Sequence, residues 1–314
     1  MVLEDRWLRE TYVDLLIEYA KKDDRLVIVE ADLMKAAGTT RFGNEFPEKT
    51  VNCGVQEANM IGVAAGMSAM GKIPFTHTFT PFSTRRVCDQ VTLSVAYAGL
   101  NVKIMGSDPG VTAELNGGTH MSMEDVAIMR NIPGMIIYEP VDSAQLRSIF
   151  PQILEHYGPV YIRLLRRNAV KVFDENTEFK LGKGTVLKEG KDVTVLASGI
   201  MVAEAMKAAQ VLSEKGIDAE IINIHTIKPL DEELVLKSAM KTGAVVTAEN
   251  HSILNGLGGA TAEFLSSTYP VPIQRVGVKD TFGEVGLTDF LKEKYGLTDK
   301  EIVLAAEKAV SMKR

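Results

Sequence analysis

The sequence predicts an α/β protein with two domains, and three observations support this fold class. Apolar runs of five to eight residues recur along the chain, and each is followed by a helical pattern. The runs are almost continuously hydrophobic, which is typical of parallel strands covered on both faces. The composition turns charged and polar between Asn168 and Asp192, which predicts a linker. A chain of 314 residues is long enough for two domains of ordinary size.

The first domain is expected to span residues 1–168 and to contain a mainly parallel sheet. Its predicted strands, in chain order, are 26–33, 50–55, 73–79, 102–108, 135–140 and 160–165. The helices expected between these strands are 9–21, 57–70, 84–98, 122–130 and 143–156. A linker follows over residues 169–192, and we expect a short hairpin within it.

The second, smaller domain is expected over residues 193–314 and repeats the strand–helix alternation. Its predicted strands are 193–199, 218–226, 244–250 and 273–278, and its predicted helices are 201–215, 231–241 and 258–267. The segment GLGGA (256–260) partly matches a phosphate-binding loop, but it lacks a preceding strand at the right distance. A helix start assisted by glycine is therefore the favoured interpretation.

Composition excludes several classes of function. The net charge is −6 and no basic stripe is present, so nucleic acid is not an expected partner. The two cysteines form no disulfide framework, which suits a reducing compartment. The first residues are too polar for a signal peptide, and the longest apolar run, 60–70, is too short and glycine-rich to span a bilayer. We therefore expect a cytoplasmic protein without a membrane partner.

Glu57 is the most informative single residue. It follows a β-type run directly and precedes a helix of small and apolar residues. Burying an unpaired carboxylate is costly, so Glu57 either has a specific partner or faces a site. In the helix after it, Ala58, Gly62 and Gly66 are spaced at i, i+4 and i+8, which leaves one face nearly without side chains. Such a face predicts a site built at a subunit junction.

Other polar and aromatic residues also follow predicted strand ends, where ligands of open α/β sheets bind. They are Asp32, His77, Phe79, Phe82, Asp108, Asn116, His120, Arg163, Arg166 and Arg167. Together with Glu57, these residues predict a site for a flat, partly apolar, anionic ligand. The serines lack a G-x-S-x-G setting, and the histidines are too far apart for a metal signature.

Simpler interpretations exist for several of these residues. Asp32 is a suitable cap for a helix starting near Met34. Phe79 and Phe82 are aromatic residues of a kind more often found in a core, and His120 is placed where it could cap its own helix. The arginines could form a solvated strand end, although a phosphate favours such a cluster.

Several ordered segments together resemble the carboxyl-terminal half of a transketolase. They are ADL (31–33), VNCGVQEANMIGVAAGM (51–67), HTFTPF (77–82), NGGTHMSMEDVAIMR (116–130), IRLLRRN (162–168) and ENHSILNGLGGATAEF (249–264). The resemblance covers nearly the whole chain. It implies a pyrimidine-binding domain of the type found in thiamine diphosphate enzymes, a linker and a transketolase C-terminal domain.

The resemblance implies thiamine diphosphate as the cofactor. Glu57 matches the catalytic glutamate that hydrogen-bonds the aminopyrimidine ring, and Phe79 and Phe82 match the aromatic residues that pack on this ring. Asp32 belongs to the matched cofactor-binding segments. His120 matches a catalytic histidine near the hydroxyl groups of the donor.

The resemblance also implies the reaction and the substrate contacts. Arg166 matches an anchor for sugar phosphates, Arg9 is a second candidate anchor, and Asn116 lies in the loop that contacts the donor. The implied activity is transfer of a two-carbon ketol unit between sugar phosphates, as in the pentose phosphate pathway.

The chain lacks the GDG segment through which this family binds the metal that holds the diphosphate. The resemblance therefore implies that Mg²⁺ is bound by another polypeptide, the amino-terminal subunit of a split transketolase. The chain would be active only with that partner, in a homodimer or heterotetramer.

One segment departs from the family pattern. Transketolases commonly carry His-Asp after the fourth strand and an acidic residue in the next loop. Here the segment SDPGVTAELNGGTH carries Ser107-Asp108 and Asn116 at these places and is one residue longer. The contacts with the donor sugar are therefore expected to differ.

Alternative functions are a 1-deoxy-D-xylulose-5-phosphate synthase-like activity, a 2-oxoacid dehydrogenase β-like activity, and a non-catalytic regulatory role. The segments QEANM and IRLLRRN favour a transketolase, since a decarboxylating subunit needs no phosphate anchor. The presence of Glu57 and Phe82 argues against a non-catalytic role.

Overall fold

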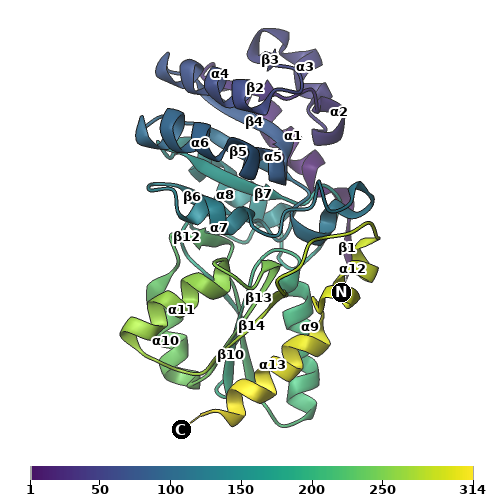
Figure 1. Ribbon diagram of the computed structural model, residues 1–314, viewed down its shortest axis with the longest axis vertical. Helices are drawn as coiled ribbons and strands as arrows, with labels where there is room; N and C mark the ends of the chain where they lie inside the picture. The colour runs from purple at the N-terminus through teal and green to yellow at the C-terminus, as the bar shows by residue number, and fades with distance from the viewer. Residues whose placement is uncertain (1, 314) are drawn as a thin grey trace.

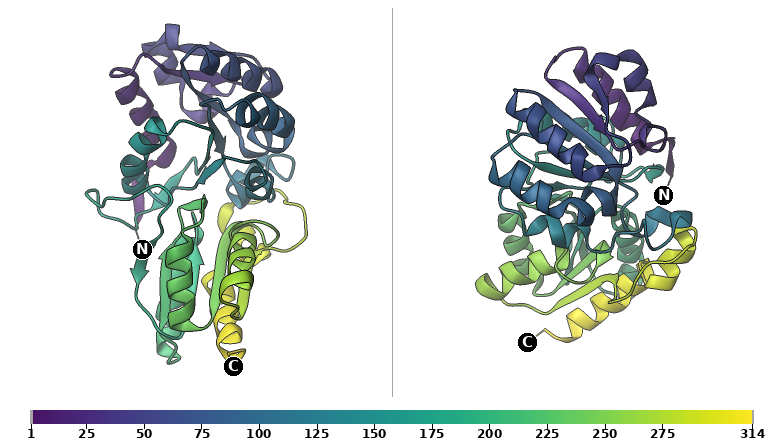
Figure 2. Two further views of the ribbon diagram at one scale, coloured as in Figure 1. Left: turned by 90° about the vertical axis from the view of Figure 1, so that its left-hand side faces the viewer. Right: turned by 45° about the horizontal axis from the view of Figure 1, so that its top comes forward.

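The computed structural model describes residues 2–313 and contains two domains, each built around its own sheet (Figure 1). The first domain forms the upper part of Figure 1, and the second domain lies below it. Two further views show the two sheets and their helices one above the other (Figure 2). One strand, Thr226–Lys228, follows a strand of the second sheet in the chain but pairs in the first sheet. The predicted two-domain α/β fold is confirmed.

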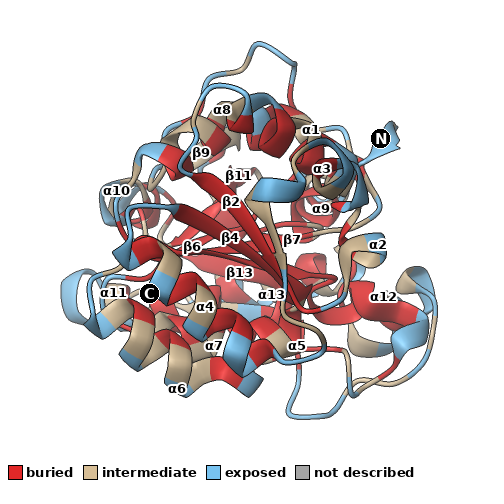
Figure 3. Ribbon diagram, turned by 90° about the horizontal axis from the view of Figure 1, so that it is seen from above, coloured by how far each residue is buried: buried red, intermediate tan, exposed pale blue. Residues whose placement is uncertain are grey.

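The first sheet has seven strands in the order β12-β6-β7-β5-β4-β2-β3. All neighbouring strands are parallel except β12, which pairs antiparallel with β6. The strands are β2 (Leu26–Glu30), β3 (Thr50–Asn52), β4 (Ile73–Phe79), β5 (Lys103–Ser107), β6 (Ile136–Tyr138), β7 (Val160–Leu164) and β12 (Thr226–Lys228). The central strands are buried along their length, as their continuous apolar sequences predict (Figure 3).

Helices cover both faces of this sheet, with α1 and α8 on one face and α4, α6 and α7 on the other (Figure 3). The helices are α1 (Leu8–Ala20), α2 (Met34–Ala37), α3 (Thr40–Glu45), α4 (Glu57–Ala69), α5 (Thr80–Ser83), α6 (Cys88–Gln90), α7 (Asp125–Arg130) and α8 (Ser143–Glu155). Short 3₁₀ segments cover Pro47–Lys49, Arg85–Val87 and Gly110–Asn116, and a π-helical segment covers Val91–Tyr97. Separate apolar cores fill the space on the two faces.

The second sheet has five strands in the order β14-β13-β10-β11-β9. They are β9 (Thr185–Lys188), β10 (Val193–Ala197), β11 (Ala219–Asn223), β13 (Val245–Ser252) and β14 (Ile273–Val278). Its helices are α9 (Met201–Glu214), α10 (Glu232–Thr242), α11 (Leu257–Thr268), α12 (Thr288–Tyr295) and α13 (Asp299–Ser311). A small antiparallel pair joins the chain start to the end of the first domain, through β1 (Leu3–Trp7) and β8 (Asn168–Val170).

Two helix predictions were wrong in their extent. The helix expected over 84–98 is divided into the 3₁₀ segment, α6 and the π-helical segment, while Val87, Val91 and Val95 still form the buried stripe. A π-helical turn inserts a residue, and such turns occur frequently at functional sites. The helix expected from residue 122 begins only at Asp125, because the residues before it belong to a loop held by other contacts.

Two predictions about strand pairing were also wrong. The run 218–226 is divided between β11 and β12, which lie in different sheets. Both pieces are buried strands, so the apolar pattern carries no sign of the crossing. The expected hairpin in the linker is absent from the described residues, because β8 pairs with β1 and β9 pairs with β11. Within residues 2–313, none of the helices combines the length and the apolar character that crossing a membrane requires.

Candidate functional site

Glu57 is a buried carboxylate with a specific ion-pair partner. It is the first residue of α4, and only 4% of its surface is exposed. Arg86 donates from Nη1 to Glu57 Oε2 at 2.9 Å, and Thr78 donates from Oγ1 to Oε1 at 3.5 Å. Arg86 was not singled out from the sequence. There it is only the second of two adjacent arginines in a predicted helix, and nothing indicates that it pairs with Glu57. Arg86 is therefore the charged partner that the buried carboxylate of Glu57 requires.

The predicted aromatic residues gather beside this pair. Phe79 ends β4 and Phe82 lies in α5, and their rings meet edge to face at 6.4 Å. The His120 ring stands edge-on to both, 5.5 Å from Phe79 and 5.1 Å from Phe82. The Arg86 guanidinium lies 3.8 Å from the centre of the Phe82 ring. All three rings are partly exposed, so Phe79 and Phe82 are not core residues.

A cleft of about 430 Å³ brings together three other predicted residues, Arg9, Asp32 and Arg166. We call this the arginine cleft; it is lined by Trp7, Arg9, Asp32, Leu33, Lys35, Ala36, Arg166 and Arg167. The Arg9 guanidinium lies 4.4 Å from the centre of the Trp7 ring and donates to the Ala36 carbonyl oxygen. Trp7 and Lys35 were missed in the sequence: Trp7 precedes the first predicted strand, and Lys35, two residues after the strand predicted over 26–33, was not singled out.

The arginine cleft carries concentrated positive charge. Arg166 Nε lies 3.1 Å from Asp108 Oδ2, beside the cleft. Burial raises the pKa of Asp108 to about 6, against the opposing effect of Arg166, Arg167 and Arg9. Burial lowers the pKa of Arg9 from its usual value, and the nearby charge of Arg166 lowers it further. Several cationic groups held this close favour binding of an anion.

Asp32 fixes the loop that leads to Glu57. Its Oδ1 accepts a hydrogen bond from Asn52 Nδ2 at 3.1 Å, and Asn52 Oδ1 accepts from the backbone N–H of Gly54 at 3.0 Å. The N-cap position of α2 is Leu33, so Asp32 is not the cap of that helix. Asp32 lies in the arginine cleft, and its predicted contact with the cofactor stays a prediction.

Two residues expected at the ligand edge are buried in the protein instead. Arg163 is fully buried and pairs with Asp125 and Glu139. It thereby joins α7 to the segment after β6. His77 is also buried, between the Tyr12 hydroxyl and the Glu30 carboxylate. Both residues lie within their strands rather than beyond the carboxyl edge of the sheet. Helices cover both faces of this sheet, so a side chain within a central strand is buried whichever face it points to.

Asn116 lies in the loop that carries His120, as predicted, and its side chain is exposed.

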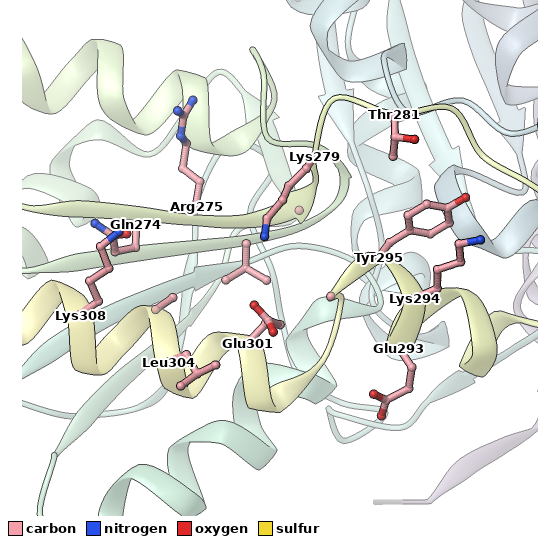
Figure 4. Close-up of a pocket in the computed structure, with 14 residues that line it drawn as sticks. Gln274, Arg275, Lys279, Thr281, Glu293, Lys294, Tyr295, Glu301, Leu304 and Lys308 are labelled. Atoms are coloured by element: carbon pink, nitrogen blue, oxygen red, sulfur yellow. The ribbon is translucent and has the colours of Figure 1, made fainter.

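A larger cleft, of about 530 Å³, lies in the C-terminal domain between β14, α12 and α13 (Figure 4). It presents Arg275, Lys279 and Lys308, and its described lining includes none of the predicted site residues. Size therefore does not identify the site; the gathering of chemically suitable residues does.

The residues around Glu57 fit the pyrimidine end of thiamine diphosphate. A buried carboxyl group can share a proton with a ring nitrogen, and partly exposed aromatic rings can pack against a flat heteroaromatic ring. Among residues 2–313, no group of three or more His, Cys, Asp and Glu side chains is placed to hold a metal ion. The donor set of the described chain thus suits the ring of the cofactor.

Comparisons with known proteins agree along nearly the whole chain. The family model for the transketolase pyrimidine-binding domain matches residues 6–171, and that for the transketolase C-terminal domain matches residues 182–302. A 6-deoxy-6-sulfo-D-fructose transketolase subunit from Clostridium sp. (strain MSTE9) is 70% identical over 311 residues, which cover 99% of this chain and 97% of the relative.

Two other comparisons extend this result. An apulose-4-phosphate transketolase subunit from Phocaeicola vulgatus is 36% identical over 93% of this chain and 94% of the relative. A solved structure, described as a split gene transketolase in an inactive β4 tetramer, is 45% identical and has a TM-score of 0.90. The match covers 98% of this chain and 99% of that chain.

Proposed function

This chain belongs to the transketolase family and has the extent of one subunit of a split transketolase, and from this premise we propose a specific reaction. The subunit transfers a two-carbon ketol unit from 6-deoxy-6-sulfo-D-fructose to an aldehyde acceptor, with thiamine diphosphate as the cofactor. The C2–C3 bond of the donor breaks, and its other four carbons leave as an aldehyde that keeps the sulfonate. The observation that carries this proposal is the 70% identity to a subunit named for that sugar, over nearly the whole of both chains.

The arginine cleft supports a donor with an anionic end. A sulfonate and a phosphate share a tetrahedral arrangement of oxygens, and arginine is well suited to bind both. The sequence resemblance implies sugar phosphates, and the relative from P. vulgatus is named for one. We propose the sulfonated ketose in their place, because the more similar relative is named for it and the loop around Asn116 departs from the usual pattern.

The residues around Glu57 act on the cofactor in this proposal. When bound, thiamine diphosphate supplies the carbon that takes up the ketol unit. Glu57 would hold a proton at the pyrimidine ring, and Phe79 and Phe82 would orient that ring. The Arg86 guanidinium already touches both Glu57 and Phe82, so it would hold the carboxylate in place. His120, beside both rings, would contact the hydroxyl groups of the donor.

The partner in this proposal is an amino-terminal subunit that binds Mg²⁺ and the diphosphate. Two relatives are named as subunits, and the similar solved structure is described as a split gene product in a tetramer. We propose that the glycine face of α4 is a subunit contact. A Cβ atom added at Gly62 or Gly66 would meet no atom of the described chain within 4 Å, so the face is open.

Replacing Gly66 with Leu is expected to weaken assembly with the amino-terminal subunit by about 5- to 150-fold, the range that corresponds to overpacking a tight contact. The reason is steric, since at the proposed contact the other subunit would pack closely on this open face and leave no space for a leucine side chain. Sedimentation of the mixed subunits measures the change. Ser213→Leu, on the exposed face of α9, adds the same side chain elsewhere and should assemble normally. Normal assembly of Gly66→Leu would contradict the proposed contact.

The reaction itself is tested by producing this chain together with its amino-terminal partner. The complex, supplied with thiamine diphosphate and Mg²⁺, is given either 6-deoxy-6-sulfo-D-fructose or fructose 6-phosphate, with glyceraldehyde 3-phosphate as acceptor. We expect the complex to turn over the sulfonated donor faster than the phosphorylated one. We expect this chain alone to show no turnover and no binding of the cofactor at micromolar concentration. A preference for the phosphorylated donor would contradict the proposed substrate. Turnover by the isolated chain would contradict the proposed need for a partner.

A further inference from the structure

The segment between β5 and α7, residues 108–124, carries both Asn116 and His120, and we call it the substrate loop. It belongs in sequence to the first domain. Nevertheless, its contacts with the C-terminal domain extend from its start to its end, and α12 packs directly on it (Figure 2). Each of these contacts fixes a different part of the loop.

Asn250, two residues before the end of β13, holds the start of the loop. Its Oδ1 accepts a hydrogen bond from the backbone N–H of Val111 at 3.0 Å, and its Nδ2 donates to the Pro109 carbonyl oxygen at 2.9 Å. The Asn250 side chain is fully buried. Between these two contacts lies Gly110, where a Cβ atom would stand 2.2 Å from Asn250 Oδ1. The loop therefore reaches this close only because a glycine occupies the position.

Glu114 holds the middle of the loop in a strained conformation. Its backbone has φ +49° and ψ −119°, outside the regions that side-chain-bearing residues normally adopt. Its carboxylate is 6% exposed and accepts hydrogen bonds from the backbone N–H and Oγ1 of Thr288, at 3.2 and 2.5 Å. Glu114 Oε2 also pairs with Arg167 Nη2 at 2.6 Å. Strain of this kind persists only where surrounding contacts enforce it.

The end of the loop rests on the segment that precedes α12. A Cβ atom at Gly118 would stand 2.3 Å from the Gly283 carbonyl oxygen, so the two backbones are in direct contact. This segment is itself fixed, because the Tyr295 hydroxyl donates to the Phe282 carbonyl oxygen at 3.1 Å (Figure 4, where Tyr295 lies below Thr281). Where the loop ends, Ser252 N–H donates to the Met123 carbonyl oxygen at 2.8 Å.

We propose that the C-terminal domain sets the position of the substrate loop, and that Thr288 is a positioning residue for Asn116 and His120. This inference rests on the proposed function, since it concerns how the same site receives its donor. Glu114 links Thr288 to Arg167, next to Arg166 in the arginine cleft. One contact from the C-terminal domain thus fixes the loop and the arginines together, and it determines donor affinity without touching the donor.

The test uses Thr288→Val and Thr288→Ser in the complex with the amino-terminal subunit. Valine has the shape of threonine but removes the hydroxyl donor, whereas serine keeps it. We expect Thr288→Val to raise the KM for 6-deoxy-6-sulfo-D-fructose about tenfold, on the scale of a lost hydrogen bond to a charged group, with a smaller change in kcat. Thr288→Ser should restore the KM to near the wild-type value.

A second measurement does not depend on the reaction. In the unassembled chain, hydrogen exchange of the backbone amides of residues 110–120 should be faster in Thr288→Val than in the wild type or Thr288→Ser. The matched control is Thr298→Val, which removes the hydroxyl cap of α13 in the same domain. It should lower thermal stability and leave both the donor KM and the loop exchange unchanged.

The proposal is overturned if Thr288→Val leaves loop exchange and donor KM at wild-type values, or if Thr298→Val changes them equally. A wild-type complex that turns over no ketose would defeat the proposed function instead. In that case the exchange measurement still decides the role of Thr288 in holding the loop.

Discussion

Glu57→Gln is expected to lower kcat of the assembled enzyme by about 10²–10⁴-fold, the usual scale for losing acid–base assistance. Glutamine has the same shape but cannot hold a proton for the pyrimidine ring, and it also loses the ion pair with Arg86. Steady-state turnover of 6-deoxy-6-sulfo-D-fructose measures the loss. Hydrogen–deuterium exchange at the thiazolium carbon of the cofactor should slow in parallel.

The matched control for this variant is Glu220→Gln. Glu220 is another buried carboxylate, in β11 of the C-terminal domain, where it pairs with Lys241 and accepts from Thr194. Its replacement tests the general effect of neutralising a buried carboxylate, and the turnover of correctly folded complex should stay near the wild-type value. If Glu57→Gln assembles and its cofactor exchanges at the wild-type rate, Glu57 has only a structural role.

Arg166→Ala is expected to lower kcat/KM for the sulfonated donor by about 10- to 150-fold. This range corresponds to the roughly 1.5–3 kcal/mol of a hydrogen bond to a charged group. An uncharged analogue, 6-deoxy-D-fructose, lacks the anion that Arg166 would bind and should change little. Comparing the two donors separates loss of anion binding from general damage to the site. An equal loss for both donors would make Arg166 a scaffold for Asp108 rather than a substrate anchor.

The same variant should also shift the pH dependence of the enzyme. Burial raises the pKa of Asp108 to about 6, while Arg166 opposes this rise. Removing the Arg166 charge should therefore raise the pKa of Asp108 further, so a larger fraction of Asp108 is protonated at any given pH near neutrality. If the ionised carboxylate holds the loop, the acid limb of the kcat/KM profile for 6-deoxy-D-fructose should move to higher pH. If the acid limb does not shift, the ionisation of Asp108 does not control activity.

Much of the fold was predictable from local pattern. The strands β4 and β14 have the predicted bounds, and the predicted helices α1, α4 and α8 differ from the observed ones by a residue at one or both ends. Continuous apolar runs predict buried parallel strands because both faces of such a strand are covered. The long periodic elements carry this signal most strongly. Short elements such as α2 and α3 carry too few residues for a periodicity to show.

Part of the site was predictable for a related reason. The rule that ligands bind beyond the carboxyl ends of parallel strands selected Asp32 and Arg166, and the family resemblance added Arg9. The structure brings these three together in one cleft. The isolated position of Glu57 between a strand and a helix of small residues also indicated, without any structure, that this carboxylate either has a specific partner or faces a site.

What the sequence alone determined is therefore the type of most long elements, the family and several of the residues that the structure brings together. The helices α12 and α13 were not predicted. Only the tertiary structure decided which side chains turn inward, as Arg163 and His77 do, and which distant residues pair. The Glu57–Arg86 pair joins residues 29 positions apart, and the Glu114–Thr288 contact joins residues 174 positions apart. Such contacts leave no periodic signal in the sequence, because they depend on how separately folded elements pack. For that reason the hold of the C-terminal domain on the substrate loop is visible only in the folded chain.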